Sequence, residues 1–348
     1  MHASGDRSSR AKFVIFLLML ALCLITLFSL TIGSSDISLT TALWALIEGE
    51  PISLKEQVIL FDIRAPRTVM GLLVGASLAV SGAIMQGLFR NPLADPGLIG
   101  VSSGASLGAV SAIVIGGLLP ATILNSVGGL LVPVAAFIGG WGCMLILYKI
   151  ATRQGRTSVA VMLLAGLALS AFAAALSGLL IYFSNDSQLR NLTFWNLGSI
   201  AGAHWGTLKI AGPLMFVALL LAPLVATGLN RLALGEAAAM HLGVSVQRLK
   251  RASFLLVGVS VGVAVAVSGA IGFIGIIVPH LLRLVIGPNH RYLLPAAALL
   301  GGITLLLADI LSRTLIAPSE LPIGIVMAIL GGPFFLYLLL RNRSLLDL

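Results

Sequence analysis

The chain has 348 residues, of which 58% are hydrophobic and only 9% are charged. An average soluble domain carries roughly 25% charged residues, so this composition excludes a protein whose whole surface faces water. The formal charge of +9 comes from Lys and Arg residues in short loops between apolar segments, a pattern that indicates membrane topology rather than nucleic-acid binding.

Apolar segments recur along the whole chain, and each is long enough to cross a ~30 Å hydrocarbon core as a helix that satisfies its own backbone groups. The first one is too long for the apolar region of a secretion signal, roughly 7–15 residues, and is interpreted as a spanning helix. We predict an all-α polytopic membrane protein with a cytoplasmic tail at residues 1–12 and one transmembrane domain at residues 13–348. Ten spans are expected, at residues 13–33, 65–88, 98–119, 128–150, 157–183, 209–229, 252–270, 272–287, 292–312 and 322–340.

The Lys and Arg residues concentrate on one side of these spans. An even number of spans leaves both termini on the same side, and the cation-rich side of a membrane protein is the cytoplasmic one. The opposite side carries acidic residues such as Asp186 and Glu320 and few cations. The charge pattern therefore predicts that both termini are cytoplasmic.

A sequence repeat relates the two halves of the chain. Five spans separate the beginnings of its two copies, so the copies cross the membrane in opposite directions and form an inverted-topology repeat, which places a translocation pathway between the halves. The alternative is that the shared AVSGAI sequence is ordinary small-residue helix sequence, which leaves the matching Arg and Pro unexplained. Arg64, Ala79–Ile84 and Pro92 recur, at a constant offset of 187 residues, as Arg251, Ala266–Ile271 and Pro279.

The chain contains no G-x-x-x-x-G-K-[ST] sequence, so it has no P-loop to cradle nucleotide phosphates. Energy for uphill transport would come from a separate ATPase or from an ion gradient. Between the sixth and seventh spans, the Ala-rich segment Gly235–Gly243 predicts a short helix on the cytoplasmic face, with Gly243 as the helix stop. The alternative is an ordinary surface loop.

Three arginines are exceptions to the charge rule. Arg64, Arg67 and Arg313 lie at the predicted non-cytoplasmic ends of the second and ninth spans. A guanidinium group at such a position can form a two-point pair with a carboxylate of a partner protein. The alternative is local pairing within the chain, for example of Arg64 with Asp62 or of Arg313 with Asp309.

Several stretches together resemble one transporter family, the FecCD permease subunits of type II ABC importers, which take up ferric siderophores, heme and vitamin B12. The resemblance extends from about residue 13 to the C-terminus, and it is the combination of stretches that is specific. The stretches are RAPR at 64–67, GASLAVSGAIMQ at 75–86, RNPLADPGLIG at 90–100, GFIGIIVPH at 272–280, LADILSR at 307–313 and ELPIG at 320–324.

The resemblance implies the type II ABC importer permease fold with ten helices per subunit, located in the bacterial inner membrane. It implies a second permease copy, as a homodimer or a paired homologue, two cytoplasmic ATPase subunits and a periplasmic substrate-binding protein. In the family, the positions of Arg64, Arg67 and Arg313 meet Glu residues of the binding protein. No catalytic residue, metal or cofactor is expected in this chain, and ATP and Mg²⁺ are expected in the partner ATPase. The residues expected to couple to the ATPase are Glu236, Ala237, Ala238, Met240, His241, Leu242, Gly243 and Val244.

Residues 187–205 are most similar to the heme-importing members, so heme is the expected substrate, with a ferric siderophore or cobalamin as the alternative. Arg190 is a candidate to meet a heme propionate and His204 a candidate to contact the iron or the porphyrin. The simpler interpretation is that Trp195 and Trp205 belong to an interfacial aromatic belt and that the lone histidine is structural.

Two other function classes share some of these features. An ion-coupled secondary transporter also shows inverted repeats and lacks a P-loop, but it needs ionisable residues near the membrane midplane, and none is evident. A channel needs a ring of selectivity groups, and no filter sequence is evident either. The ATP-driven importer therefore remains the preferred hypothesis.

Overall fold

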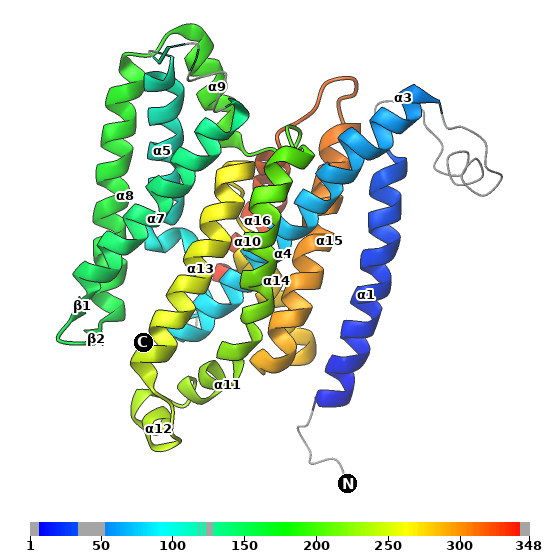
Figure 1. Ribbon diagram of the computed structural model, residues 1–348. Coiled ribbons are helices and arrows are strands. Elements are labelled where there is room, and N and C mark those ends of the chain that lie inside the picture. The colour runs from blue at the N-terminus through cyan, green and yellow to red at the C-terminus, as the bar shows by residue number, and fades with distance from the viewer. Residues whose placement is uncertain (1–6, 34–52, 118, 121, 123–127, 342–348) are drawn as a thin grey trace.

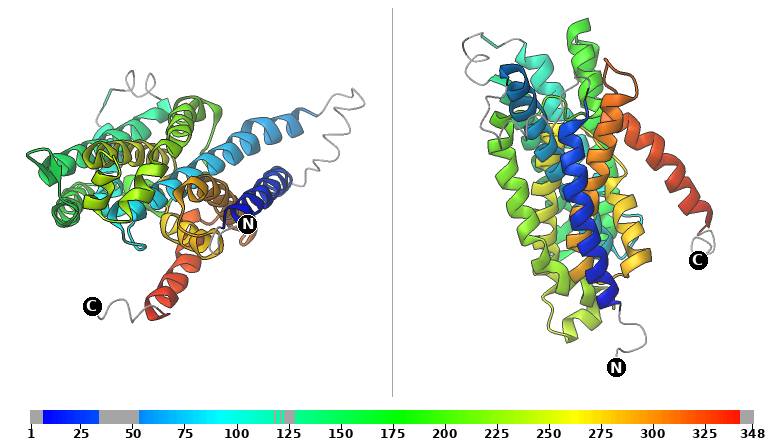
Figure 2. Two further views of the ribbon diagram at one scale, coloured as in Figure 1. Left: turned by 90° about the horizontal axis from the view of Figure 1, so that it is seen from below. Right: turned by 90° about the vertical axis from the view of Figure 1, so that its right-hand side faces the viewer.

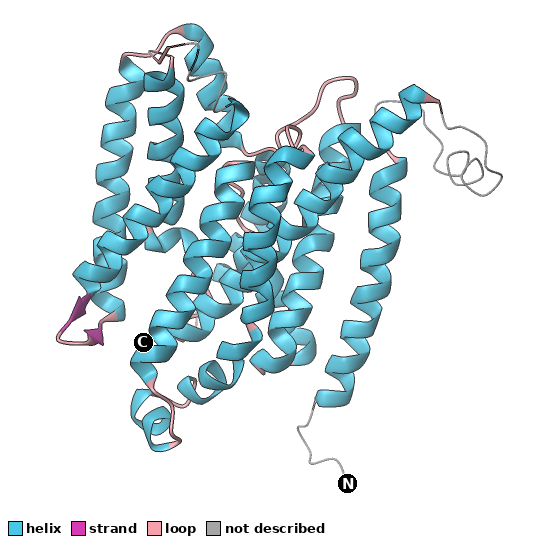
Figure 3. Ribbon diagram, viewed as in Figure 1, coloured by secondary structure: helices cyan, strands magenta, loops and turns pink. Residues whose placement is uncertain are grey.

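The computed structural model describes residues 7–33, 53–117, 119, 120, 122 and 128–341, and these residues are almost entirely helical (Figures 1 and 3). Residues 1–6 of the predicted N-terminal tail lie outside the described part. The only strands in the described ranges form a two-stranded hairpin, in which Thr152 pairs with Thr157. The elements are α1 (Ser8–Thr31), α3 (Leu54–Gln57), the π-helix η1 (Val58–Arg64), α4 (Ala65–Phe89), η2 (Pro96–Ile99), α5 (Val101–Gly116), η3 (Gly128–Leu130), α7 (Leu131–Ala151), β1 (Thr152–Arg153), β2 (Arg156–Thr157), α8 (Val159–Tyr182), α9 (Asp186–Leu197), α10 (Trp205–Leu221), α11 (Pro223–Leu232), α12 (Glu236–His241), α13 (Val246–Ser268), α14 (Ile274–Ile286), α15 (His290–Thr314) and α16 (Ile323–Arg341).

Within the described part of the chain, six helical segments are long and apolar enough to cross a membrane: α1, α4 with the preceding α3 and η1, α7, α8, α13 and α15. The pair α10 and α11 forms a seventh candidate, bent by 45° at Pro223, which lacks a backbone N–H to continue the hydrogen-bond ladder. Helices α5, α14 and α16 are also apolar but shorter, with apolar stretches of 10–17 residues. Each predicted span coincides with a helix or with the bent pair, so the chain is a multi-pass membrane protein. The count of ten crossings stays a prediction.

The helices run between two ends of the molecule. The upper end, at the top of Figure 1, holds the C-terminal ends of α1 and α15 and the start of α4. The lower end holds the start of α1, the helix α12 and the start of α15. Figure 2 shows α16 leaving the upper end and diverging from the other helices as it descends. Because α1 starts at the lower end and α16 descends toward it, this path agrees with termini on the same side.

Helix α4 is the centre of the bundle and α1 lies at its edge. In the apolar stretch of the segment that contains α4, 83% of the residues are buried, whereas in the apolar stretch of α1 only 6% are buried. Glycines let backbones pack directly on α4: a Cβ at Gly75 would collide with the carbonyl oxygen of Gly301, and one at Gly82 would collide with that of Gly275. Such contacts allow tight packing where lipid supplies no hydrophobic drive for association.

The two copies of the repeat lie in opposite directions, as predicted. Helix α4 descends from the upper end, and α13 rises from the lower end (Figure 1). The copies differ at their shared AVSGAI sequence, because α4 continues to Phe89 whereas α13 ends at Ser268. Gly269 follows with a φ of 69°, and a Cβ there would collide with the carbonyl oxygen of Trp195. The close contact of Gly269 with the distant Trp195 backbone therefore explains why the helix of the second copy ends at Ser268.

Candidate functional site

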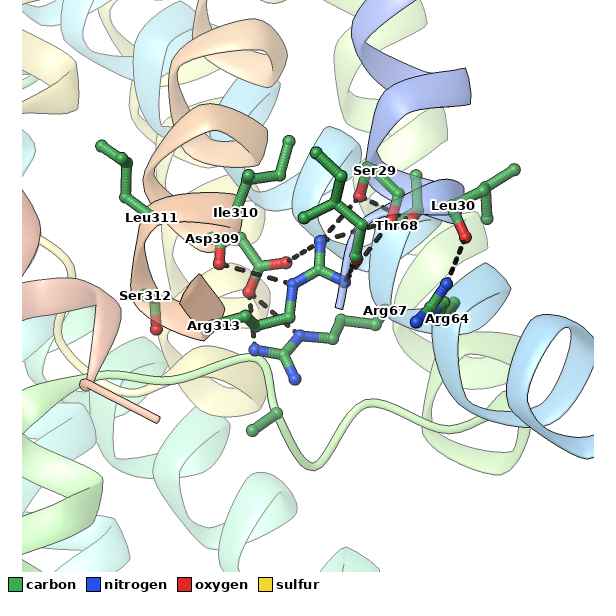
Figure 4. Close-up of polar contacts among 12 residues, drawn as sticks. Ser29, Leu30, Arg64, Arg67, Thr68, Asp309, Ile310, Leu311, Ser312 and Arg313 are labelled. Atoms are coloured by element: carbon green, nitrogen blue, oxygen red, sulfur yellow. Dashed lines mark hydrogen bonds and ion pairs between the residues drawn. The ribbon is translucent and has the colours of Figure 1, made fainter. Parts of the chain in front are cut away.

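A group of charged side chains lies at the upper end, where α1, α4 and α15 meet (Figure 4). Arg67 is in the first turn of α4, Asp309 and Arg313 lie one turn apart near the end of α15, and Glu320 is in the loop between α15 and α16. Arg67, Asp309 and Arg313 are at most 5% exposed. We call these four residues the arginine cluster.

Arg67 is held by two carboxylates. Its Nε and Nη2 donate to Oδ1 of Asp309 at 3.0 and 2.8 Å, and its Nη1 donates to Oε1 of Glu320 at 3.0 Å. The second oxygen of Glu320 lies 3.0 Å from Arg67 Nη2, so the two planar groups meet at two points. The Glu320 side chain is 34% exposed, and it is the member of the arginine cluster that reaches water.

Two arginines bind the C-terminal end of α1. Arg313 donates from Nη1 to the carbonyl oxygen of Ile32 at 2.9 Å and from Nη2 to Oγ of Ser29 at 3.1 Å. Arg64 donates from Nη1 to the carbonyl oxygen of Leu30 at 2.9 Å. The last carbonyl groups of a helix lack partners within it and form the negative end of its dipole. The two guanidinium groups therefore fix the end of α1 against α4 and α15.

The structure brings Arg64, Arg67 and Arg313 to one end of the molecule but turns all three toward its interior. The local alternative is confirmed for one pair: Nη2 of Arg313 lies 3.0 Å from Oδ2 of Asp309, an ion pair without hydrogen-bond geometry. Contact of these arginines with a binding protein stays a prediction. Any such contact must compete with the intrachain partners, and Glu320 is the most accessible of those.

The pairing of Glu320 with Arg67 could not be predicted from the sequence. The residue belongs to the ELPIG stretch, but 253 positions separate it from Arg67, and no periodicity relates the two. The loop after α15 places it: the Leu321 N–H donates to the carbonyl oxygen of Ser312 at 3.0 Å, which folds the loop back onto the last turns of the helix.

The predicted short helix is present at the lower end as α12. Gly235 precedes it and Gly243 follows it, with φ values of 106° and 82° that glycine adopts readily. Gly243 donates its N–H to the carbonyl oxygen of Met240 at 2.9 Å, so the helix ends where the sequence predicts. Among the expected coupling residues, Glu236, Ala237, Met240, His241, Leu242 and Gly243 are exposed, and Ala238 and Val244 are partly buried.

The side of α12 that points away from the bundle exposes apolar side chains beside the polar Glu236 and His241. Met240 is 58% exposed and Leu242 is 49% exposed, whereas Ala239 on the opposite face is fully buried. A cavity of about 570 Å³ lies beside the helix, lined by Met240, Arg156 and Arg248 among others. Exposed apolar side chains beside a charged hollow are typical of a protein-docking surface.

Polar bonds tie α12 to the bundle. Nζ of Lys250, which is 2% exposed, donates to Oε1 of Glu236 at 2.8 Å and to the carbonyl oxygen of Thr157 at 2.9 Å. Nη1 of Arg231 donates to the carbonyl oxygen of Leu242 at 2.9 Å. These bonds join α12 to α13, to the hairpin and to α11, so a displacement of α12 would be transmitted to the spans.

The two candidate substrate residues lie on separate elements. Arg190 is exposed on α9. His204 precedes the first turn of α10 and caps it: its ring Nδ1 accepts the N–H of Thr207 at 3.4 Å, and its Nε2 lies 2.8 Å from the Thr207 hydroxyl. The structure therefore gives His204 a local structural role, and contact of either residue with a substrate stays a prediction.

Comparisons with known proteins agree with this architecture. The profile of the FecCD transport family matches residues 19–341. The hemin transport system permease protein HmuU of Yersinia pestis is 44% identical over 94% of this chain and 96% of its own length. The vitamin B12 import system permease protein BtuC of Klebsiella pneumoniae is 42% identical over 99% of this chain and 97% of its own. A solved metal-chelate type ABC transporter in an inward-facing conformation superposes with a TM-score of 0.82 at 33% identity, covering 95% of this chain and 99% of that one. The chain belongs to the FecCD transport family and has the permease fold of a type II ABC importer.

Proposed function

We propose that this chain is the permease subunit of an ATP-driven importer that moves heme across the bacterial inner membrane. The observation that carries the proposal is the 44% identity to a hemin permease over nearly the full length of both chains. Cobalamin is the second candidate, because a vitamin B12 permease is 42% identical over 99% of this chain. A ferric siderophore is the third, supported by the likeness to a metal-chelate transporter.

Hydrolysis of ATP takes place in two partner subunits on the cytoplasmic side, which is the lower end. The chain itself is not an enzyme, lacks a P-loop and carries no cofactor, whereas its partners bind ATP and Mg²⁺. The exposed Met240 of α12 and Leu242, which directly follows the helix, provide the docking surface. The bonds of Lys250 and Arg231 to this segment then convert closure of the ATPase into movement of α13 and α11.

A periplasmic binding protein delivers the substrate at the upper end. The arginine cluster lies there, and Glu320 forms an ion pair with Arg67 from the solvent side. A carboxylate of the binding protein reaches the guanidinium group by replacing Glu320, because Asp309 is fully buried. Docking therefore exchanges one carboxylate for another, with little change in the charge of the site.

A second copy of the chain completes the pathway. Helix α16 diverges from the other helices (Figure 2) and exposes Ile329, at 66%, to its surroundings. A cavity of about 410 Å³ lies between the end of α9, the break after α13 and α16, and its lining includes Asn196, Ala270 and Gly324. Apart from Asn196, its lining is apolar, which suits the passage of a large ligand. Arg190 and His204 are the residues proposed to meet the propionates and the iron of heme.

The test is reconstitution of the chain in vesicles with its ATPase and binding-protein partners. We expect heme-loaded binding protein to stimulate ATP hydrolysis and heme uptake, and cobalamin or ferric siderophores to do so less. Stronger stimulation by cobalamin would transfer the assignment to the second candidate. Uptake driven by a proton or sodium gradient, by this chain alone, would contradict the importer.

A further inference from the structure

An apolar groove opens on the side of the bundle, between α1 and the bent pair α10–α11. Its volume is about 490 Å³, within the ~300–1,000 Å³ of ligand pockets, and its walls come from α1, α4, α10, α11 and α15. Met19 of α1 and Phe216 of α10, which line it, are 46% and 54% exposed. The groove therefore faces the surroundings of the bundle and not its interior.

The groove has the depth of one membrane leaflet. On α15 it extends from Leu294 to Gly302, which at the rise of an α-helix is about 12 Å, close to half of a ~30 Å hydrocarbon core. On α1, which begins at the lower end (Figure 1), it extends from Ile15 to Leu22, within the lower half of the predicted span at residues 13–33. Its lining is apolar throughout, so it has the shape and the chemistry to hold a hydrocarbon chain in the leaflet at the lower end.

Two cations stand below the groove, on the same helix faces that line it. On α15, Arg291 precedes the lining residues Pro295 and Ala298 with the 4- and 3-residue spacing of one helix face. On α1, Lys12 precedes the lining residues Ile15 and Met19 with 3- and 4-residue spacing. Each cation is therefore about one turn below the apolar wall of its own helix.

The direction of both helices favours an anion at this rim. Because α1 and α15 both begin at the lower end, their side chains lean toward it, and their positive dipole ends lie there. Lys12 and Arg291 are exposed, and among the described residues neither forms an ion pair with a carboxylate. Asn230 of α11 donates from Nδ2 to Oδ1 of Asn289 at 2.7 Å, and this bond joins α11, which forms one wall of the groove, to the start of α15.

We propose that this groove is a binding site for an anionic glycerophospholipid, with one acyl chain between α1 and α10–α11 and the phosphate at Lys12 and Arg291. The lipid would brace the 45° bend at Pro223, directly before the α11 segment that leads to α12. Because the site is defined on this chain alone, it holds whichever substrate the transporter carries.

The test measures lipid retention by the purified full-length chain with native mass spectrometry. Phosphatidylglycerol and phosphatidylcholine with identical acyl chains are titrated into detergent micelles. We expect preferential retention of phosphatidylglycerol. Each cation near a membrane surface contributes about five-fold to anionic lipid binding, so Lys12→Gln with Arg291→Gln should reduce the preference by roughly 25-fold.

Two further variants separate the parts of the site. Arg10→Gln removes an exposed cation on the opposite face of α1 from Lys12 and should leave the preference unchanged. Ala298→Leu fills the groove and should reduce retention of both lipids while the thermal unfolding temperature is preserved. Equal retention of the two lipids by the unsubstituted chain would overturn the proposal. So would an unchanged preference in the double variant, or disulfide cross-linking between two chains through Cys introduced at Met19, which would show a second copy in the groove.

Discussion

Replacement of Asp309 by Asn tests the arginine cluster most directly. Asp309 is fully buried and is the only carboxylate within the cluster that pairs with both Arg67 and Arg313. The amide keeps one oxygen for Arg67, but the cluster gains a net positive charge that water does not screen. Breaking a buried pair by removing one partner costs ~3–5 kcal/mol, and the retained oxygen places this variant near ~3 kcal/mol.

The matched control is Glu320→Gln, which removes the exposed carboxylate from the same guanidinium group. Its side chain is 34% exposed, so we expect a loss of about 1 kcal/mol or less. The measurement is the free energy of unfolding in detergent micelles, from a denaturant titration followed by circular dichroism. A D309N chain within ~1 kcal/mol of the original would show that water screens the cluster, and a Glu320→Gln chain as unstable as D309N would show that Glu320 is shielded as well as Asp309 is. Either result would refute the reasoning.

Three other predictions concern the lower end and the core. Met240→Asp places a charge on the exposed face of α12, so we expect loss of ATPase co-purification with unchanged thermal stability; co-purification at the original level would exclude this face as the docking surface. Lys250→Gln removes the ion pair with Glu236, and it should lower substrate-stimulated ATP hydrolysis more than ATPase binding, because α12 loses a bond to α13; an equal loss of both would point to misfolding. Gly82→Ala forces a Cβ against the Gly275 backbone and should cost more than the ~1–3 kcal/mol typical of overpacking, measured by the same denaturant titration, whereas a neutral result would show that α4 and α14 separate easily.

Much of the architecture could be predicted from the sequence because, in lipid, the local sequence of a segment determines whether it forms a membrane-spanning helix. A span must be apolar for most of its length and must satisfy its own backbone, so all ten predicted segments coincide with a helix or with the bent pair. The repeat predicted the opposite directions of α4 and α13. The end of α12 was also predictable, because the left-handed backbone at Gly243 is a local property of glycine.

Contacts between distant segments could not be predicted in this way. The hydropathy pattern predicts Arg67 at the end of a span, but only the packing of α4 on α15 turns it inward to Asp309. Only the fold of a loop 253 residues away brings Glu320 to it. The end of α13 at Ser268 depends likewise on the approach of the Trp195 backbone. Hydropathy and helical spacing are patterns of residues close together in the sequence, so they can be recognised along the chain. The partner of a buried charge or of a close-packed glycine depends on which helices meet, and only the tertiary structure decides that.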